Sequence, residues 1–332
     1  MDIQDLSFAP GKKVSGKIPA AQRSLSSIEI PVTVIHGTQK GPHLCVIAGE
    51  HANEYAGIEA AIRLARDIVP EQVRGTLSIL PVINVPGFEN RTPYVNPIDR
   101  VNVVKSWPGK PNGGTLTDVI THTLFQAVIA KCNYLVSLHG GDICESMIPC
   151  SYFWDTGKEE VDRLAERLAG LFETEFAIQY SYVNKLAMEA SSLGIPKIIV
   201  EAGGEGKVAE KDVQMLVRGV YNVMKDVGMM AGEPIRKIRP KIIRGKEKLV
   251  YVGSSTAGLF YSKPEVGDLV SQGEVIGMIK DYQGNMVEEI RSPINGKIFF
   301  KINPLPWDPD LGWFLFQIVD TGEKDNKKES LK

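Results

Sequence analysis

The sequence predicts an α/β protein whose sheet carries helices on both faces, followed by a small C-terminal all-β domain. Short apolar, β-branched segments alternate with segments of helical periodicity through residues 44–227. This alternation ends near Gly232, and only short strands broken by glycines follow from Leu249 onward. Strands that are apolar along their whole length favour a sheet covered on both faces. We therefore predict an α/β domain of residues 1–234 and a β domain of residues 235–332 with a charged C-terminal tail.

The strands are predicted from short runs rich in Val, Ile and Leu, and the helices from apolar residues that recur every three to four positions. The segment between Glu89 and Gly114 is predicted as a loop, and loops of this length inside compact domains are usually functional or disordered. In chain order, we expect a strand at 44–48, a helix at 53–68, a strand at 76–82, a helix at 115–130, a strand at 134–138, a helix at 158–172, a strand at 197–200 and a helix at 210–227.

Composition and charge exclude several classes of function. The 332 residues are 43% apolar and 23% charged, and the formal net charge is −2, so no electrostatic footprint for nucleic acid or a membrane surface is expected. No apolar run approaches the ~20 residues of a membrane helix, and Met1-Asp2-Ile3 does not begin a signal peptide. The four cysteines show no Cys-x-x-Cys spacing, so we expect neither a disulfide scaffold nor a thiolate zinc site. We expect a cytoplasmic protein with no nucleic-acid or membrane partner.

Polar side chains follow three of the predicted strands at the point where each strand ends. His51 and Glu54 follow the strand at 44–48, His139 follows the strand at 134–138, and Glu201 follows the strand at 197–200. In α/β sheets, ligands bind at these carboxyl ends. An imidazole and a carboxylate three positions apart can converge on one metal ion where a helix begins. Two His and one Glu with an open fourth position form a catalytic zinc set.

Each of these residues also has a structural explanation. His51 and Glu54 could belong to an ordinary helix start with an acid in its first turn, and His139 could be a hydrogen-bonded core histidine. Glu201 could pair with a nearby cation. We favour function because a carboxylate at the end of an apolar strand costs desolvation energy unless it has a partner or a task.

Four motifs resemble the succinylglutamate desuccinylase/aspartoacylase family, a branch related to zinc carboxypeptidases. The resemblance covers residues 41–206 and extends into the β domain. It rests on Gly-Glu-His51-x-x-Glu54-x-x-Gly, Arg91-Thr-Pro, Leu-His139-Gly-Gly-Asp and Glu201-Ala-Gly-Gly. The resemblance implies a zinc-carboxypeptidase-like mixed sheet, one zinc ion per chain held by His51, Glu54 and His139, Glu201 as general base, and Arg91 as the group that polarises the substrate carbonyl.

One motif departs from the family pattern. The family usually carries Asp-x-x-Asn-Leu-Asn-Arg-x-Phe-Pro-Gly, whose Asn-Arg pair binds a substrate carboxylate, whereas here Val104 and Lys105 occupy the places of that pair. A lysine is a point charge and lacks the planar fork that grips a carboxylate with two hydrogen bonds. Asn102, Lys105 and Arg100 are our candidates for substrate binding, and we expect an altered substrate preference.

The resemblance implies a hydrolase that cleaves the amide of a small N-acyl amino acid or N-acyl amine with one Zn²⁺. Two alternatives remain: a zinc carboxypeptidase acting on peptides, and a non-enzymatic degenerate homologue. The β domain resembles a barrel-sandwich hybrid of the biotinyl/lipoyl type, but no lysine occupies its hairpin tip near Tyr282-Gln283-Gly284. We therefore expect it to shield the active site or to form an oligomer contact, and a homo-oligomer is possible. The acyl group, the amine, and manganese or cobalt in place of zinc stay open.

Overall fold

The structure is a computed structural model that describes residues 9–180, 182–245, 248–303, 306–307 and 314–322. The chain forms two compact units. The first comprises the residues up to Ile143 together with Pro149–Ile242, and the second comprises Cys144–Ile148 together with the residues from Ile243 onward. The division of the chain into domains of residues 1–234 and 235–332 stays a prediction.

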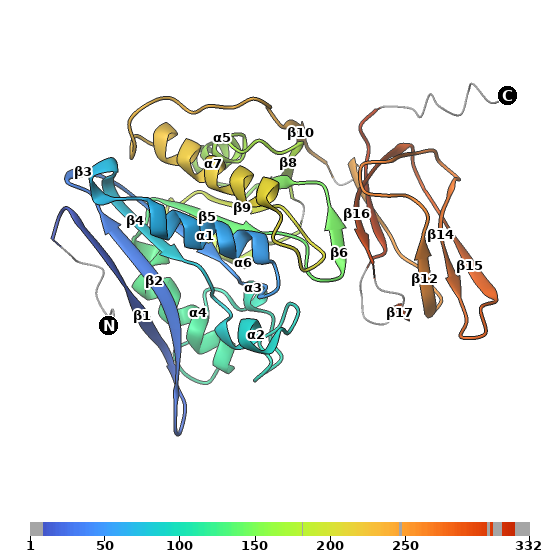
Figure 1. The fold of residues 1–332 in the computed structure, drawn as a ribbon, viewed down its shortest axis with the longest axis horizontal. Coiled ribbons are helices and arrows are strands. Elements are labelled where there is room, and N and C mark those ends of the chain that lie inside the picture. The colour runs from blue at the N-terminus through green and yellow to red at the C-terminus, as the bar shows by residue number, and fades with distance from the viewer. Residues whose placement is uncertain (1–8, 181, 246–247, 304–305, 308–313, 323–332) are drawn as a thin grey trace. The chain divides into compact units, whose positions relative to one another are not determined.

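A nine-stranded mixed sheet is the framework of the first unit (Figure 1). Its centre is parallel, since β3 pairs in parallel with β4 and β5, and β5 pairs in parallel with β9. The strands on either side, β2 and β7, run antiparallel to this centre. In sheet order, the strands are β1 (Lys12–Gln22), β2 (Ser27–His36), β4 (Arg74–Leu80), β3 (Gln39–Ala48), β5 (Tyr134–His139), β9 (Lys197–Glu201), β7 (Cys150–Phe153), β8 (Phe176–Gln179) and β10 (Lys241–Ile243).

Helices cover both faces of this sheet, which confirms the predicted fold class. On one face, α1, α5 and α7 share a core with inward side chains of the strands, such as Val46, Val136 and Val200. On the other face, α3, α4 and α6 pack with Cys45, Leu135 and the strands of the β1–β2 hairpin. The helices are α1 (Tyr55–Asp67), α2 (Val85–Asn90), α3 (Val103–Ser106), α4 (Leu116–Ala127), α5 (Glu159–Ala169), α6 (Lys185–Ser192) and α7 (Glu210–Asp226), with short 3-10 turns at Pro70–Gln72 and Ile129–Lys131.

The four predicted helices are present as α1, α4, α5 and α7, each slightly shorter than predicted. The four predicted strands are present as β3, β4, β5 and β9. The predicted loop at 89–114 contains more structure than expected, because it includes α3 and a β-bridge between Val95 and Asn102. Thr117 fastens this segment to α4, since both its backbone N–H and its hydroxyl donate hydrogen bonds to the carboxylate of Asp99, at 2.6 and 2.8 Å.

The second unit is all-β and encloses its own apolar core. One sheet has the order β11-β18-β16-β13, with β6 also pairing with β16, and the other has the order β15-β14-β12-β17. Both sheets contribute to one core, as Phe260 of β12 and Phe316 of β18 show by their edge-to-face contact. The strands are β6 (Glu145–Met147), β11 (Leu249–Val252), β12 (Gly258–Ser262), β13 (Leu269–Val270), β14 (Val275–Lys280), β15 (Met286–Arg291), β16 (Gly296–Ile302), β17 (Pro306–Trp307) and β18 (Phe316–Val319).

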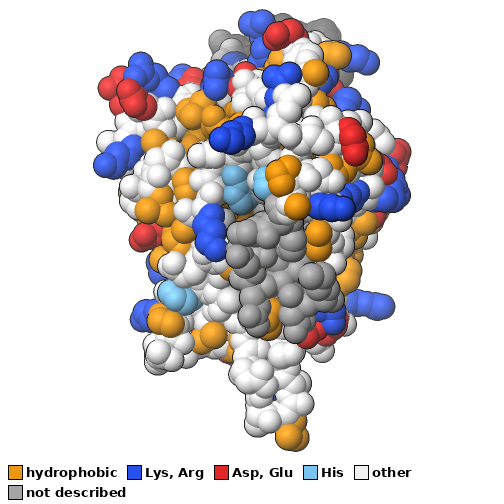
Figure 2. All heavy atoms as spheres, turned by 90° about the vertical axis from the view of Figure 1, so that its left-hand side faces the viewer, with side chains coloured by type: hydrophobic (Ala, Val, Ile, Leu, Met, Phe, Trp, Pro, Cys, Tyr) orange, Lys and Arg blue, Asp and Glu red, His pale blue; other side chains and the backbone are white. Residues whose placement is uncertain are grey.

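Two further features are the distribution of charge on one face and the apolar character of the helices. On the face shown in Figure 2, basic side chains are spread over the surface, and acidic side chains lie mostly near its edges. Among the described residues, no helix combines the length and the apolar character that crossing a bilayer requires.

Candidate active site

The parallel centre of the sheet brings the predicted site residues to one edge. His139 is the last residue of β5, Glu201 is the last residue of β9, and the two are register partners. After β3, the chain turns at Gly49, whose φ is +64° and where a Cβ would lie 3.1 Å from the Cα of Val82. This turn leads directly to His51 and then to Glu54, the N-cap residue of α1. The arrangement follows from strand ends that face the same way in neighbouring parallel strands.

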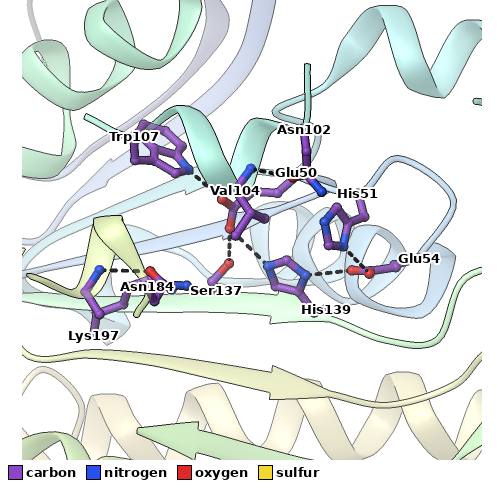
Figure 3. Close-up of polar contacts among 11 residues, drawn as sticks. Glu50, His51, Glu54, Asn102, Val104, Trp107, Ser137, His139, Asn184 and Lys197 are labelled. Atoms are coloured by element: carbon purple, nitrogen blue, oxygen red, sulfur yellow. Dashed lines mark hydrogen bonds and ion pairs between the residues drawn. The ribbon is translucent and has the colours of Figure 1, made fainter. Parts of the chain in front are cut away.

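The two imidazoles converge on one carboxylate (Figure 3). Nδ1 of His51 lies 2.7 Å from Oε1 of Glu54, and Nδ1 of His139 lies 2.7 Å from Oε2 of the same side chain. One potential ligand atom from each residue lies within 4.8 Å of the others. Glu54 and His139 are buried, and the side chain of His51 is 18% exposed although its Nε2 is buried without a hydrogen-bond partner among the described residues. In the described part of the chain, no other trio of His, Cys or acidic side chains converges in this way.

This donor set fits a divalent metal ion. Two imidazole nitrogens and one carboxylate match the three protein ligands of a catalytic zinc site. Burial opposes protonation of His139, but the charges of Glu54 and Glu50 and the hydrogen bonds to both outweigh it and raise its pKa to about 10 in the metal-free protein. A metal ion must displace that proton, because only a neutral imidazole is a ligand.

Glu50 is a part of the site that sequence reasoning missed. Its side chain is 1% exposed and accepts hydrogen bonds from the indole N–H of Trp107 at 2.7 Å and the hydroxyl of Ser137 at 2.5 Å. Its Oε2 also lies 3.0 Å from Nε2 of His139 (Figure 3). Burial opposes ionisation of Glu50, but the hydrogen bond and charge of His139, the charge of Lys197 and the hydroxyl of Ser137 hold its pKa well below the ordinary value. The sequence did contain a signal for Glu50, because this acidic residue lies directly between an apolar strand and a candidate ligand.

A buried lysine was also missed. Lys197, the first residue of β9, is 4% exposed, and its Nζ lies 3.4 Å from Oδ1 of Asn184 and 4.9 Å from the ring centroid of Trp154. Burial lowers the pKa of Lys197 to about 8, although the charges of Glu50 and Glu201 partly oppose that shift. The signal in the sequence was a lysine that begins an otherwise apolar strand. Glu201 at the other end of β9 is half-buried.

The segment that carries Arg91, the residue predicted to polarise the substrate carbonyl, has an unusual backbone. Arg91, Tyr94 and Arg100 have φ values of +52°, +57° and +59°, a region that residues other than glycine rarely adopt. The ring of Tyr94 lies 5.3 Å from that of His51, edge to face, so this segment adjoins the candidate metal ligands. Arg91 itself is exposed and lines a groove with Tyr55, Phe88 and Val208, a groove that none of the three ligands lines.

The candidate substrate-binding residues lie around α3. The side-chain oxygen of Asn102 accepts a hydrogen bond from the backbone N–H of Val104 at 2.9 Å and so caps this helix. Lys105 and Arg100 are exposed. Trp107, at the C-terminal end of α3, joins this segment to the site through its hydrogen bond to Glu50. The structure therefore places this segment next to the candidate metal ligands, with the side chains of Lys105 and Arg100 exposed.

Comparison with known proteins shows the family of the chain. The family model for the catalytic domain of succinylglutamate desuccinylase/aspartoacylase matches residues 40–227. The N-alpha-acetyl-L-2,4-diaminobutyric acid deacetylase of Halomonas elongata is 28% identical over 273 residues, which cover 80% of this chain and 78% of that protein.

Solved structures share the fold along nearly the whole chain. A succinylglutamate desuccinylase/aspartoacylase from Rhodobacter sphaeroides superposes with a TM-score of 0.83 at 23% identity and covers 95% of this chain and 98% of its own. The ectoine utilization protein EutE (DoeB) from Ruegeria pomeroyi, in a product-bound structure, also gives a TM-score of 0.83, at 22% identity, with 94% of this chain and 97% of that chain covered.

Proposed function

The chain belongs to the succinylglutamate desuccinylase/aspartoacylase family, and from that premise we propose that it is a zinc-dependent deacylase that hydrolyses the amide of a small N-acyl amino acid or N-acyl amine. The observation that carries the proposal is the convergence of His51, Glu54 and His139 at the strand ends, with Glu201 in register beside His139. One zinc ion per chain would be held by the first three residues.

In the proposed reaction, the metal ion and the side chains of the protein have different tasks. When bound, zinc would supply a Lewis acid that polarises the amide carbonyl and acidifies an attacking water to a pKa of roughly 7. Glu201 takes the proton of the attacking water and then donates it to the leaving amine, because a half-buried carboxylate can serve as base and then as acid. Arg91 would stabilise the oxyanion that develops on the carbonyl oxygen, if its exposed side chain turns from the groove toward the ligands.

Substrate recognition is proposed for the segment around α3. The relative from Halomonas elongata is named for N-alpha-acetyl-L-2,4-diaminobutyric acid, a substrate with a free carboxylate. Lys105, Asn102 and Arg100 are the polar groups of this segment that would meet such a carboxylate. The cytoplasmic location and any homo-oligomer stay predictions.

Amine release tests the reaction class directly. The purified protein is incubated, with zinc or after chelator treatment, with N-acetyl-2,4-diaminobutyrate, other N-acyl amino acids, N-acyl diamines and unblocked peptides. We expect zinc-dependent release from at least one N-acyl substrate and none from the peptides. Release of C-terminal residues from peptides would favour the carboxypeptidase, and inactivity without zinc uptake would favour the degenerate homologue.

Replacement of the proposed base tests the mechanism. Glu201→Gln preserves the shape of the side chain but cannot accept the proton of the water, so we expect kcat to fall by about 10²- to 10⁴-fold. Zinc content, measured by atomic absorption, should stay at that of the unmodified protein. The matched control is Glu189→Gln, which changes an exposed carboxylate on α6 and should leave kcat unchanged. Full activity of the Glu201→Gln enzyme would reject Glu201 as base.

A further inference from the structure

Glu50 is a buried carboxylate beside the predicted ligands that is not itself a member of the metal-binding trio. It lies directly before His51 at the end of the turn from β3, and its side chain is 1% exposed. A buried carboxylate is costly unless it is hydrogen-bonded on both oxygens. The hydrogen-bond partners of Glu50 therefore indicate its role.

The imidazole of His139 is fixed from both sides. Its Nδ1 faces Glu54 at 2.7 Å, and its Nε2 faces Glu50 at 3.0 Å. A ring held at both nitrogens has one orientation, in which Nδ1 points to the place where the other two ligands meet. If a metal ion takes the lone pair of Nδ1, the remaining ring proton is on Nε2, where Glu50 can accept its hydrogen bond. A metal-binding His usually donates its second N–H to such an acceptor, which orients the ring and makes it a better ligand.

Glu50 is itself held by two further donors from different elements. Trp107, at the end of α3, donates its indole N–H to Oε1, and Ser137 of β5 donates its hydroxyl to Oε2. Oε2 thus receives bonds from Ser137 and His139, which lie two residues apart on the same strand. The carboxylate cannot rotate away from His139 without breaking its bonds to Trp107 and Ser137.

We propose that Glu50 is a positioning residue for the metal centre: it orients His139 for coordination, and Trp107 and Ser137 hold it in place to do so. The proposal rests on the proposed function, because it presupposes that the trio binds a metal ion. It goes beyond that function by assigning a role to three residues outside the trio. It also connects α3, which carries the candidate substrate-binding residues, to a metal ligand through a chain of two hydrogen bonds.

The test measures metal binding and needs no activity. Glu50→Gln keeps the shape of the side chain but removes its charge, so we expect the zinc Kd, measured by competition with a chromophoric chelator, to rise about 10- to 100-fold. The visible spectrum of the cobalt-substituted protein should also change, because the ring of His139 is no longer held in one orientation. A purely structural role would lower the stability of the metal-free protein and leave both readouts unchanged.

Milder variants keep the proposal testable if Glu50→Gln does not fold. Ser137→Ala and Trp107→Phe each remove one donor to Glu50, and each should raise the zinc Kd by less than Glu50→Gln. The matched control is Ser151→Ala, a fully buried serine of β7 whose hydroxyl bonds to the carbonyl of Ala169, and it should leave the Kd unchanged.

The outcomes separate the two proposals. If the unmodified protein binds zinc and all three variants bind it with the same Kd and the same cobalt spectrum, the role of Glu50 is rejected while the proposed function stands. If the unmodified protein takes up no zinc, both are rejected.

Discussion

At the residue scale, the site combines three buried or half-buried charges outside the metal trio. Glu50 and Glu201 are negative, and Lys197 at the start of β9 is the cation whose charge acts on both. A buried lysine favours its neutral form, and burial does lower the pKa of Lys197 to about 8. The fold therefore keeps a cation near the active site at neutral pH at a cost in stability, which agrees with a functional setting for these charges.

The free-energy cost of burying the charge of Lys197 predicts that the stability of the protein depends on pH. Below pH 8, Lys197 is protonated in both states, and the full penalty of burying its charge is present. Between about pH 8 and the ordinary lysine value of 10.5, the unfolded chain binds the proton more tightly than the folded one, so the free energy of unfolding rises with pH. The variant Lys197→Met has no titratable group at this position, so this rise in the free energy of unfolding should be absent from it.

Urea unfolding of the metal-free proteins at pH 7.5 to 10.5 checks this expectation. The free energy of unfolding of the unmodified protein should rise relative to that of Lys197→Met by at most about 3 kcal/mol across the window. Groups shared by the two proteins cancel in the difference to a first approximation. A difference that stays constant, or that falls with pH, would show that Lys197 is not a protonated buried group.

At the element scale, the spacing of α1 and β5 sets the geometry of the proposed metal ligands. Glu54 occupies the N-cap position of α1, and His139 is the last residue of β5. Gly57 lets these elements approach closely, because a Cβ there would lie 2.8 Å from the carbonyl oxygen of Leu138 and 3.3 Å from the backbone N of His139. Such contacts are too short for a side chain, so any substitution must push the helix and the strand apart.

Gly57→Ala should therefore weaken metal binding as well as stability. We expect the free energy of unfolding to fall by about 1–3 kcal/mol through overpacking, and zinc titration calorimetry to show weaker binding because Glu54 moves away from His139. Gly170→Ala is the control, since a Cβ at the C-terminal end of α5 meets its nearest atom at 3.4 Å, an ordinary contact. Unchanged zinc affinity in Gly57→Ala would mean that the site tolerates displacement of α1.

The elements predicted from the sequence are those whose pattern is strong. The strand ends that carry His51 and His139 follow unbroken apolar runs, and neighbouring parallel strands end at one edge, so convergence of the trio could be predicted. The β1–β2 hairpin was missed although β2 shows the alternation of a half-buried strand, with Ile28, Ile30 and Val32 at every second position. The strands β7 and β8 were missed because four residues are too few to show a pattern. Glu50 was missed because its role depends on Trp107 and Ser137, which are distant in sequence and meet only in the fold.

At the scale of the whole molecule, the apolar interior is divided. Among the described residues, the buried members of the two cores of the first unit and of the core of the second unit do not overlap, although the half-buried Val85 packs against both cores of the first unit. The chain nevertheless passes from one unit to the other more than once, since Cys144–Ile148 belong to the second unit although β5 and β7 on either side belong to the first. All three proposed metal ligands lie in the first unit.

Metal removal should therefore act on the first unit alone. A ligand that binds only the folded state stabilises it by mass action, by about 2.7 kcal/mol when its free concentration is 100 times Kd. Hydrogen exchange followed by mass spectrometry, with zinc and after chelation, should show faster exchange in peptides that contain β3, β5 and the start of α1. Peptides from β12 to β16 should exchange at the same rate in both conditions. His51→Ala, which lacks a ligand, is the control in which chelation should change nothing. Equal acceleration in both units would show instead that they unfold as one cooperative block, and that the separate cores do not open independently.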